Sequence, residues 1–133
     1  YTVTLTVTDT ANQTAQRSET VSVSSDEAPA CPNCTRYTGQ LNNGQQAAFP
    51  GNGFSFSGGQ IEGFLSSPAG TSFDVFLERR SCFLLFSCSW STVASGQGSG
   101  AQKTLNASVA SGTYRWRVRA TQGSGSFELL TNP

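Results

Sequence analysis

The sequence predicts an all-β protein built around a β-sandwich, and three observations point to that fold class. Apolar and polar residues alternate strictly through the first eight residues, YTVTLTVT, which is the pattern of a strand with one buried face. Short apolar segments recur along the rest of the chain, separated by clusters of Gly, Pro, Ser and Asn and without helical periodicity. Only 12% of the residues are charged, about half the usual fraction, which suits an extracellular β domain.

Residues 1–23 are predicted to form a β-hairpin. The first strand carries its apolar residues at odd positions, the sequence DTAN at residues 9–12 forms a turn, and the second strand places Val21 and Val23 on one face. Two strands alone are marginally stable in water, so we expect this hairpin to belong with further strands that precede it. Residues 24–30 are small, acidic and Pro-containing, which indicates a linker.

Residues 31–133 are expected to form the sandwich from a series of short strands. The predicted strands are Gly53–Ser57, Gln60–Leu65, Ser72–Arg79, Ser89–Ala94, Lys103–Val109, Gly112–Ala120 and Ser126–Leu130. The predicted turns between them lie at residues 50–53, 67–70, 95–100, 111–112 and 123–125.

The four cysteines, Cys31, Cys34, Cys82 and Cys88, lie in two close pairs. An even number in a chain rich in Ser, Thr and Gly predicts disulfides and an oxidising compartment, and therefore a secreted, extracellular protein. Four cysteines allow three pairings, and the short spacings favour Cys31–Cys34 and Cys82–Cys88. The C-x-x-C spacing of the first pair also occurs in redox and zinc sites, but no predicted helix follows it and the spacing of the second pair is unusual for zinc ligands.

The composition argues against a catalytic activity of this chain. It has no His, which removes His general bases, Ser-His-Asp triads and most zinc sites. A serine nucleophile would depend on Lys103, the single lysine, and no motif joins the two. Asp74 and Glu78 share one face of a strand about 13 Å apart, too far for a glycosidase pair. We expect no catalytic residues, metal or cofactor.

The charge and hydropathy of the chain exclude two classes of partner. The formal net charge is zero, so there is no bulk electrostatic attraction to nucleic acid. No apolar run is long enough to span a bilayer. The expected partners are an insoluble polymer, either polysaccharide or protein, or copies of the chain itself.

Two parts of the chain resemble modules of secreted bacterial proteins. YTVTLTVTD followed by QTAQRSETVSV is similar to the last two strands of a polycystic-kidney-disease (PKD) domain, an Ig-like spacer. Nearly the whole of residues 31–133 resembles the bacterial pre-peptidase C-terminal (PPC) domain. The matching segments are TGQL at 38–41, FPGNGFSFSGGQIEGFLSSPAGTSFDVFLER at 49–79, WSTVAS at 90–95 and SGTYRWRVRATQGSGSFEL at 111–129.

These resemblances imply both an architecture and a role. The PPC domain is a jelly-roll-like β-sandwich, and the PKD motif of the WDFGDG type is absent, which implies that residues 1–23 are only the last strands of such a domain. Both modules accompany secreted proteases, collagenases and chitinases. The resemblance therefore implies a non-catalytic C-terminal accessory module of a secreted bacterial hydrolase, which aids polymeric substrate binding or secretion and maturation.

The segment between Cys82 and Cys88 departs from the PPC pattern, which has a short polar turn there. The candidate contact residues in this segment are Phe83, Leu84, Leu85 and Phe86. Adjacent side chains point in different directions, so burying all four in one core is difficult. We expect an exposed apolar tip closed by Cys82–Cys88 that contacts a partner or substrate; the alternative is a loop that folds back over the core.

The segment TYRWRVRA predicts a strand with an apolar and a basic face. Tyr114, Trp116 and Val118 are expected in the core. The outward residues are Arg115, Arg117 and Arg119, about 6.6 Å apart along the strand. They are expected either to contact an acidic or hydroxyl-rich polymer through their planar guanidinium groups, or to form a solvated face balanced by Glu78 or Glu128.

Two further aromatic residues are candidate contacts. Trp90 is expected on the same face as Thr92 and Ala94, where an exposed ring would offer a stacking platform. Phe76 is expected on the opposite face from its apolar neighbours and close to Trp90, so that the two rings form a small aromatic patch.

The sequence also suggests a role of a different class. The edges of the hairpin and an apolar tip would both accept another copy of the chain. The alternative function is therefore a structural module that self-assembles into an extracellular homopolymer or filament.

Overall fold

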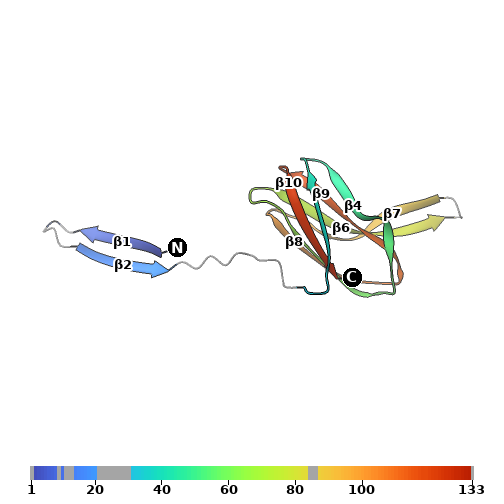
Figure 1. The fold of residues 1–133 in the computed structure, drawn as a ribbon, viewed down its shortest axis with the longest axis horizontal. Helices are drawn as coiled ribbons and strands as arrows, with labels where there is room; N and C mark the ends of the chain where they lie inside the picture. The colour runs from blue at the N-terminus through green and yellow to red at the C-terminus, as the bar shows by residue number, and fades with distance from the viewer. Residues whose placement is uncertain (1, 9, 11–13, 21–30, 84–86, 133) are drawn as a thin grey trace.

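The computed structural model describes residues 2–8, 10, 14–20, 31–83 and 87–132. Within those residues, all of the regular secondary structure is β-strand (Figure 1). The strands are β1 (Thr2–Thr8), β2 (Thr14–Thr20), β3 (Thr35–Leu41), β4 (Gln46–Phe56), β5 (Gly59–Ser66), β6 (Ser72–Phe83), β7 (Ser87–Gly96), β8 (Gln102–Val109), β9 (Gly112–Gln122) and β10 (Gly125–Asn132).

The first two strands form an antiparallel hairpin. Its register runs from the pair Thr2–Thr20 to the pair Thr8–Thr14, and the described residues of β1 and β2 form a two-stranded sheet of their own. Val21 and Val23, which the sequence analysis assigns to the second strand, lie outside the described residues.

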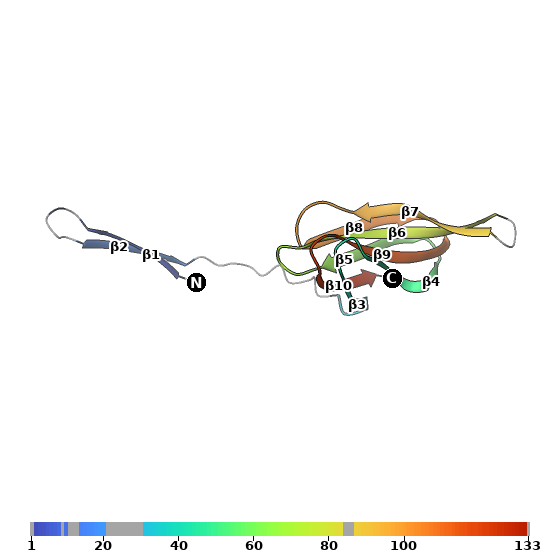
Figure 2. The same cartoon turned by 90° about the horizontal axis from the view of Figure 1, so that it is seen from above.

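The other eight strands form a jelly-roll sandwich of two four-stranded antiparallel sheets. One sheet, called the β10 sheet below, has the order β3-β10-β5-β8, and the other, called the β9 sheet, has the order β4-β9-β6-β7. Successive strands alternate between the sheets except β6 and β7, which form a hairpin within the β9 sheet. This alternation is the jelly-roll topology, and Figure 2 shows the two layers edge-on. The predicted all-β, jelly-roll-like sandwich is confirmed.

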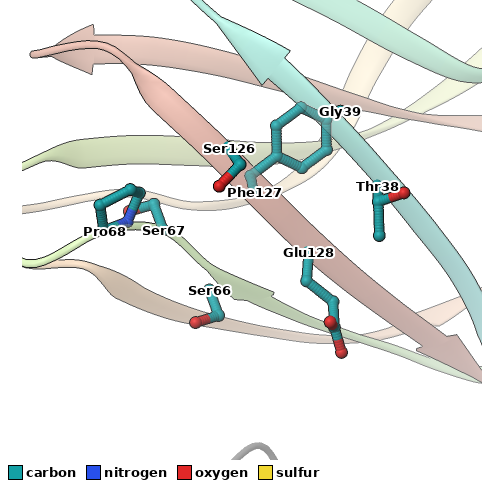
Figure 3. Close-up of a pocket in the computed structure, with 8 residues that line it drawn as sticks. All are labelled: Thr38, Gly39, Ser66, Ser67, Pro68, Ser126, Phe127 and Glu128. Carbon is teal, nitrogen blue, oxygen red and sulfur yellow. The ribbon is translucent and has the colours of Figure 1, made fainter.

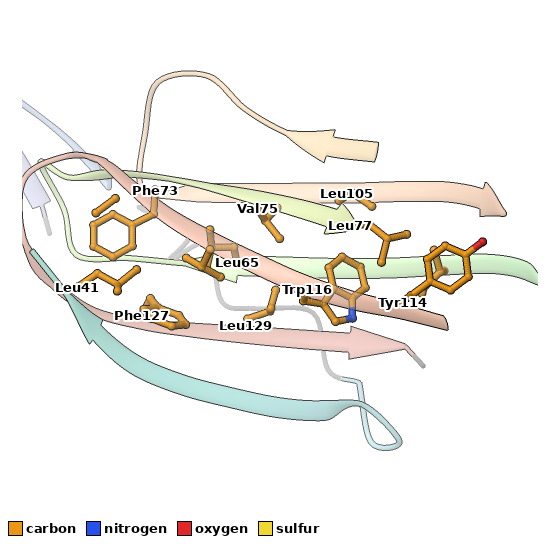
Figure 4. Packing of buried hydrophobic residues seen from close by; sticks show 13 residues of the cluster. Leu41, Leu65, Phe73, Val75, Leu77, Leu105, Tyr114, Trp116, Phe127 and Leu129 are labelled. Atoms are coloured by element: carbon orange, nitrogen blue, oxygen red, sulfur yellow. The ribbon is translucent and has the colours of Figure 1, made fainter. Parts of the chain in front are cut away.

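The core lies between the two sheets and follows the predicted alternation of β9. Tyr114, Trp116 and Val118 are almost completely buried, as predicted (Figure 4). A Cβ atom at Gly63 of the opposite sheet would lie 2.7 Å from the Trp116 ring, so this position has to be glycine for the indole to fit. The hydroxyl of Tyr114 donates to the backbone oxygen of Ala110 at 2.7 Å, which satisfies its polar end.

Two features of the fold differ from the sequence prediction in the region before β5. Residues 50–53, predicted as a turn between strands, are a bulge inside β4, which pairs with β9 on both sides of a register shift between Phe49 and Phe54. The sequence analysis also missed β3. This strand is polar because it is an edge strand, and its inward Gly39 leaves room for the Phe127 ring, which a Cβ would approach to 2.9 Å.

The hairpin of β6 and β7 extends beyond the sandwich. These strands pair from Val75–Gly96 as far as Phe83–Ser87, whereas the pairing of β6 with β9 ends at Arg79. Residues 80–83 and 87–90 therefore form a two-stranded ribbon that projects past the neighbouring strands (Figures 1 and 2). We call this ribbon the finger. The predicted loop between residues 79 and 89 is thus mostly a continuation of the two strands.

Candidate functional site

The finger carries an exposed aromatic residue beside a disulfide. Cys82 and Cys88 face each other directly across the two strands, with Cα atoms 4.0 Å apart, and they form the predicted disulfide. The next residue, Phe83, is 78% exposed. Phe83 is not among the described residues that pack against the core, so its exposure favours the exposed tip over the capping loop. Leu84, Leu85 and Phe86 lie outside the described residues.

Trp90 lies at the base of the finger and is half-buried. The guanidinium carbon of Arg115 is 4.4 Å from the centre of its ring, and a Cβ at Gly53 of the β4 bulge would lie 2.6 Å from Cη2 of the indole. Trp90 is therefore held between an arginine and the bulge. Gly51, Asn52, Arg80, Cys88 and Trp90 line a concavity of about 200 Å³ beside it.

The predicted face of Trp90 needs a correction. A register shift between Leu77 and Glu78 of β6 leaves Val93 of β7 without a partner. Val93 is consequently 44% exposed, and Ala94 packs against the core. The bulge puts Ala94 on the inner face, so it does not share a face with Trp90.

Glu78 binds two arginines on the outer face of the β9 sheet. Its side chain is almost completely buried, and it accepts hydrogen bonds from Nε of Arg115 at 2.7 Å and from Nε of Arg117 at 2.6 Å. Burial alone raises the pKa of Glu78, but the hydrogen bonds and charges of Arg117 and Arg115 outweigh burial and leave this pKa below its ordinary value.

Phe76 is not part of an exposed aromatic patch, contrary to the sequence prediction. It is 8% exposed, because the guanidinium of Arg117 lies over its ring with the guanidinium carbon 4.1 Å from the centre. Trp90 is covered by Arg115 instead. The two rings each support one arginine, and Phe76 offers little surface to a partner.

The predicted arginine stripe is only partly available for binding. Arg115 and Arg117 are both bound to Glu78, and Arg117 also donates to Oε1 of Gln46 at 3.0 Å. Arg119 is exposed, and it lies opposite Asp74, whose buried Oδ1 has no hydrogen-bond partner within the described residues. The charges of the arginine stripe are thus mainly balanced by Glu78, which is the alternative that the sequence analysis gave to a polymer-binding stripe.

The outer face of the β10 sheet holds two concavities that the sequence analysis did not find. One, of about 540 Å³, is lined by Thr38, Gly39, Ser66, Ser67, Pro68, Ser126, Phe127 and Glu128 (Figure 3). The other, of about 320 Å³, is lined by Cys31, Cys34, Glu62, Gly63, Phe64, Thr104, Asn106 and Leu130. The sequence GQIEGFLS could have indicated this face, because Phe64 occupies an outward position in its alternating strand pattern.

The turn beside the second concavity is closed by the other predicted disulfide, Cys31–Cys34. The backbone nitrogen of Cys34 donates to the oxygen of Cys31 at 3.1 Å. Both local pairings proposed from the spacing are confirmed. On the outer face of the same sheet, Arg36 and Glu128 form an ion pair, so Glu128 balances this arginine and not the arginines of β9.

The described residues contain no group of three or more His, Cys, Asp and Glu side chains that would hold a metal ion. Lys103 is buried, and its Nζ donates to the backbone oxygen of Gly100. Within the same residues, no helix has the length and apolar character that crossing a membrane requires.

Comparison with known proteins bears on the fold alone. No family model matches the chain. Among solved structures, a Yersinia pseudotuberculosis-derived mitogen is similar with a TM-score of 0.54 and 17% sequence identity, over 75% of this chain and 85% of that one. At this identity the likeness is one of architecture, and it agrees with an all-β sandwich.

Proposed function

We propose that this chain is a non-catalytic binding module of a secreted protein and that its finger holds that protein on a polymeric substrate. The observation that carries the proposal is the exposed Phe83 ring on a ribbon closed by Cys82–Cys88. A large exposed apolar side chain costs free energy in water unless a partner covers it. A disulfide-closed ribbon also loses less conformational entropy on binding than a free loop does.

The chemistry of the rest of the chain supports a secreted module. Two disulfides are typical of proteins that work in oxidising compartments. The resemblance of residues 31–133 to the PPC domain supports an accessory role behind a bacterial hydrolase such as a protease or a chitinase, in substrate binding or in secretion and maturation.

A pull-down against chitin, cellulose, collagen and casein tests the proposal. Phe83→Ala is expected to weaken retention on at least one polymer by about tenfold or more, the effect of losing a hot-spot aromatic. Val93→Ala is the matched control, because Val93 is also exposed on β7 but lies away from the finger. Equal retention of both variants, or no retention of the unmodified chain, contradicts the proposal.

A second candidate function, self-assembly, rests on the unpaired edges of the finger. Within the described residues, the pairing of β6 with β9 ends at Arg79, and β7 is one of the two edge strands of its sheet. Such edges accept strands from other chains. Size-exclusion chromatography with light scattering separates the candidates: a mass that rises with concentration and falls in Phe83→Ala favours assembly, and a constant monomer favours the binding module.

A further inference from the structure

The outer face of the β10 sheet presents a compact set of side chains at its centre. Phe64 of β5 lies beside Leu130 of β10 and beside Thr104 of β8 in the strand register. Phe64 and Leu130 lie on the solvent side of the sheet, and both are half-buried. The disulfide turn of Cys31 and Cys34 borders them and completes one wall of the concavity of about 320 Å³.

The two concavities on this face adjoin. Ser66 and Glu128, which line the larger concavity, are register partners one row along from Phe64 and Leu130, a step of about 6.6 Å. Glu62, one row in the other direction, lines the smaller concavity. Together the rows form a continuous surface that extends about 20 Å along the strands from Ser126 to Asn132.

The polar groups on this surface are hydroxyls, amides and carboxylates, together with the guanidinium of Arg36, which pairs with Glu128. With its amide oriented to satisfy both partners, Asn106 donates to Oε1 of Glu62 at 3.2 Å and to the backbone oxygen of Leu105 at 3.3 Å. The side chains of Asn106 and Glu62 are both exposed and both line the smaller concavity, where a ligand can reach them. Thr104 and Ser126 add exposed hydroxyl groups.

The backbone of this surface is not available for binding. The central strands β10 and β5 each pair with neighbours on both sides, so a peptide cannot be added here as a further strand. A ligand has to be recognised through side chains alone. An aromatic ring flanked by hydroxyls, amides and carboxylates suits a pyranose, whose C–H face stacks on the ring while its hydroxyls hydrogen-bond around it.

The charges of the surface indicate that such a saccharide is uncharged. Glu62 and Glu128 are the acidic residues that line the concavities. Glu128 is balanced by Arg36, whereas Glu62 accepts from the neutral amide of Asn106. The surface therefore carries a net negative charge, which repels carboxylated or sulfated polymers and accepts hydrogen bonds from hydroxyl groups.

From these observations we infer that the outer face of the β10 sheet is a binding site for a neutral polysaccharide, with the Phe64 ring as its stacking platform and Glu62, Thr104 and Asn106 as hydrogen-bonding groups. This site lies on the sheet opposite the one that carries the finger. The inference does not depend on the function proposed for Phe83, and either can fail alone.

Isothermal titration of the full chain with neutral hexasaccharides tests the site. The probes are cellohexaose, xylohexaose and N-acetylated chitohexaose, with hexagalacturonic acid as the anionic comparison. At least one neutral probe is expected to bind, and Phe64→Ala is expected to weaken it about tenfold or more, which corresponds to about 1.4 kcal/mol. The double variant Thr104→Ala with Asn106→Ala alters only exposed side chains, so it gives a second reading if Phe64→Ala proves unstable.

The matched control is Gln60→Ala with Ser108→Ala. These residues are register partners on the same outer face and are exposed, but they lie outside both concavities. The control variant and Phe83→Ala are expected to bind the neutral probe as the unmodified chain does. No binding of any neutral probe, preferential binding of hexagalacturonic acid, or an equal loss in the control variant overturns the inference.

Discussion

Nε of Arg117 donates to Oε1 of Glu78 at 2.6 Å, from a strand that lies beside the one carrying the carboxylate. Arg115 occupies the other carboxylate oxygen, so a single buried acid holds two cations on the outer face of the β9 sheet. The arrangement makes the stability of the sandwich depend on the ionised form of Glu78.

Replacing Glu78 by Gln is therefore expected to cost about 2 kcal/mol of unfolding free energy at neutral pH, because two charge-assisted hydrogen bonds are weakened. The folded-state pKa of Glu78 lies below its ordinary value of 4.5, so its contribution is complete above that pH and is lost as the pH falls through the folded-state pKa. Urea unfolding at several pH values should show the difference between wild type and Glu78→Gln shrinking below about pH 4.5.

The control for this experiment is Glu128→Gln, which removes an exposed ion pair with Arg36. Such pairs contribute little, so we expect a change of about 0.5 kcal/mol or less. A cost for Glu128→Gln that equals the cost for Glu78→Gln would show that burial of the carboxylate does not matter.

The substitution Gly53→Ala should destabilise the protein much more than Gly44→Ala. Both glycines have a positive φ, +81° and +82°, so both alanines introduce backbone strain of about 1 kcal/mol. At Gly53 the new Cβ would also lie 2.6 Å from Trp90 and 2.8 Å from the backbone oxygen of Tyr114, whereas nothing lies within 4 Å at Gly44. We expect about 3 kcal/mol in total at Gly53, measured by denaturant unfolding. Similar costs at the two positions would mean that the β4 bulge does not confine Trp90.

The substitution Phe83→Ala is expected to leave stability within about 0.5 kcal/mol of wild type, because the ring is exposed. Phe73→Ala, which removes a ring that is 1% exposed in the core, should cost about 3 kcal/mol or more. Thermal melts of the two variants distinguish an exposed tip from a cap over the core. A large loss of stability in Phe83→Ala would favour the cap.

Removing the finger disulfide should loosen the finger and spare the core. The double variant Cys82→Ser with Cys88→Ser no longer closes this short loop in the unfolded chain. In the chain-entropy model, the loss lowers the unfolding free energy by about 2 kcal/mol. Residues 80–83 and 87–89 are exposed, so we expect faster amide exchange there and unchanged protection of β9 and β10. Unchanged exchange in the finger would mean that strand pairing alone fixes its shape.

The amino-acid pattern predicted those parts of the fold that depend on local alternation. Trp116 and its neighbours on β9 could be assigned to the core because polar and apolar residues alternate there. β3 could not be recognised, since an edge strand with an inward glycine has little apolar character. Residues 50–53 look like a turn in the sequence, and only their pairing with β9 on both sides identifies a bulge.

The candidate site was less predictable because it depends on register between distant strands. The sequence showed that Arg115 and Arg117 face outward, but the pairing that brings Glu78 opposite Arg115 joins residues far apart in the chain. The position of Phe64 among polar groups likewise depends on the pairing of β5 with both β10 and β8. The disulfides, whose partners are local, needed no such information.

The pairing of β3 with β10 has a mechanical consequence when the sandwich is pulled from the start of β3 and the end of β10. The pair Thr35–Thr131 joins the start of β3 to the end of β10, so the chain enters and leaves the sandwich at neighbouring points. A tension applied across these points pulls the two strands apart like a zipper, breaking their hydrogen bonds one after another and not all together in shear. The sandwich would therefore yield at low force from this edge, with β3 peeling away while Cys31–Cys34 keeps the preceding turn closed.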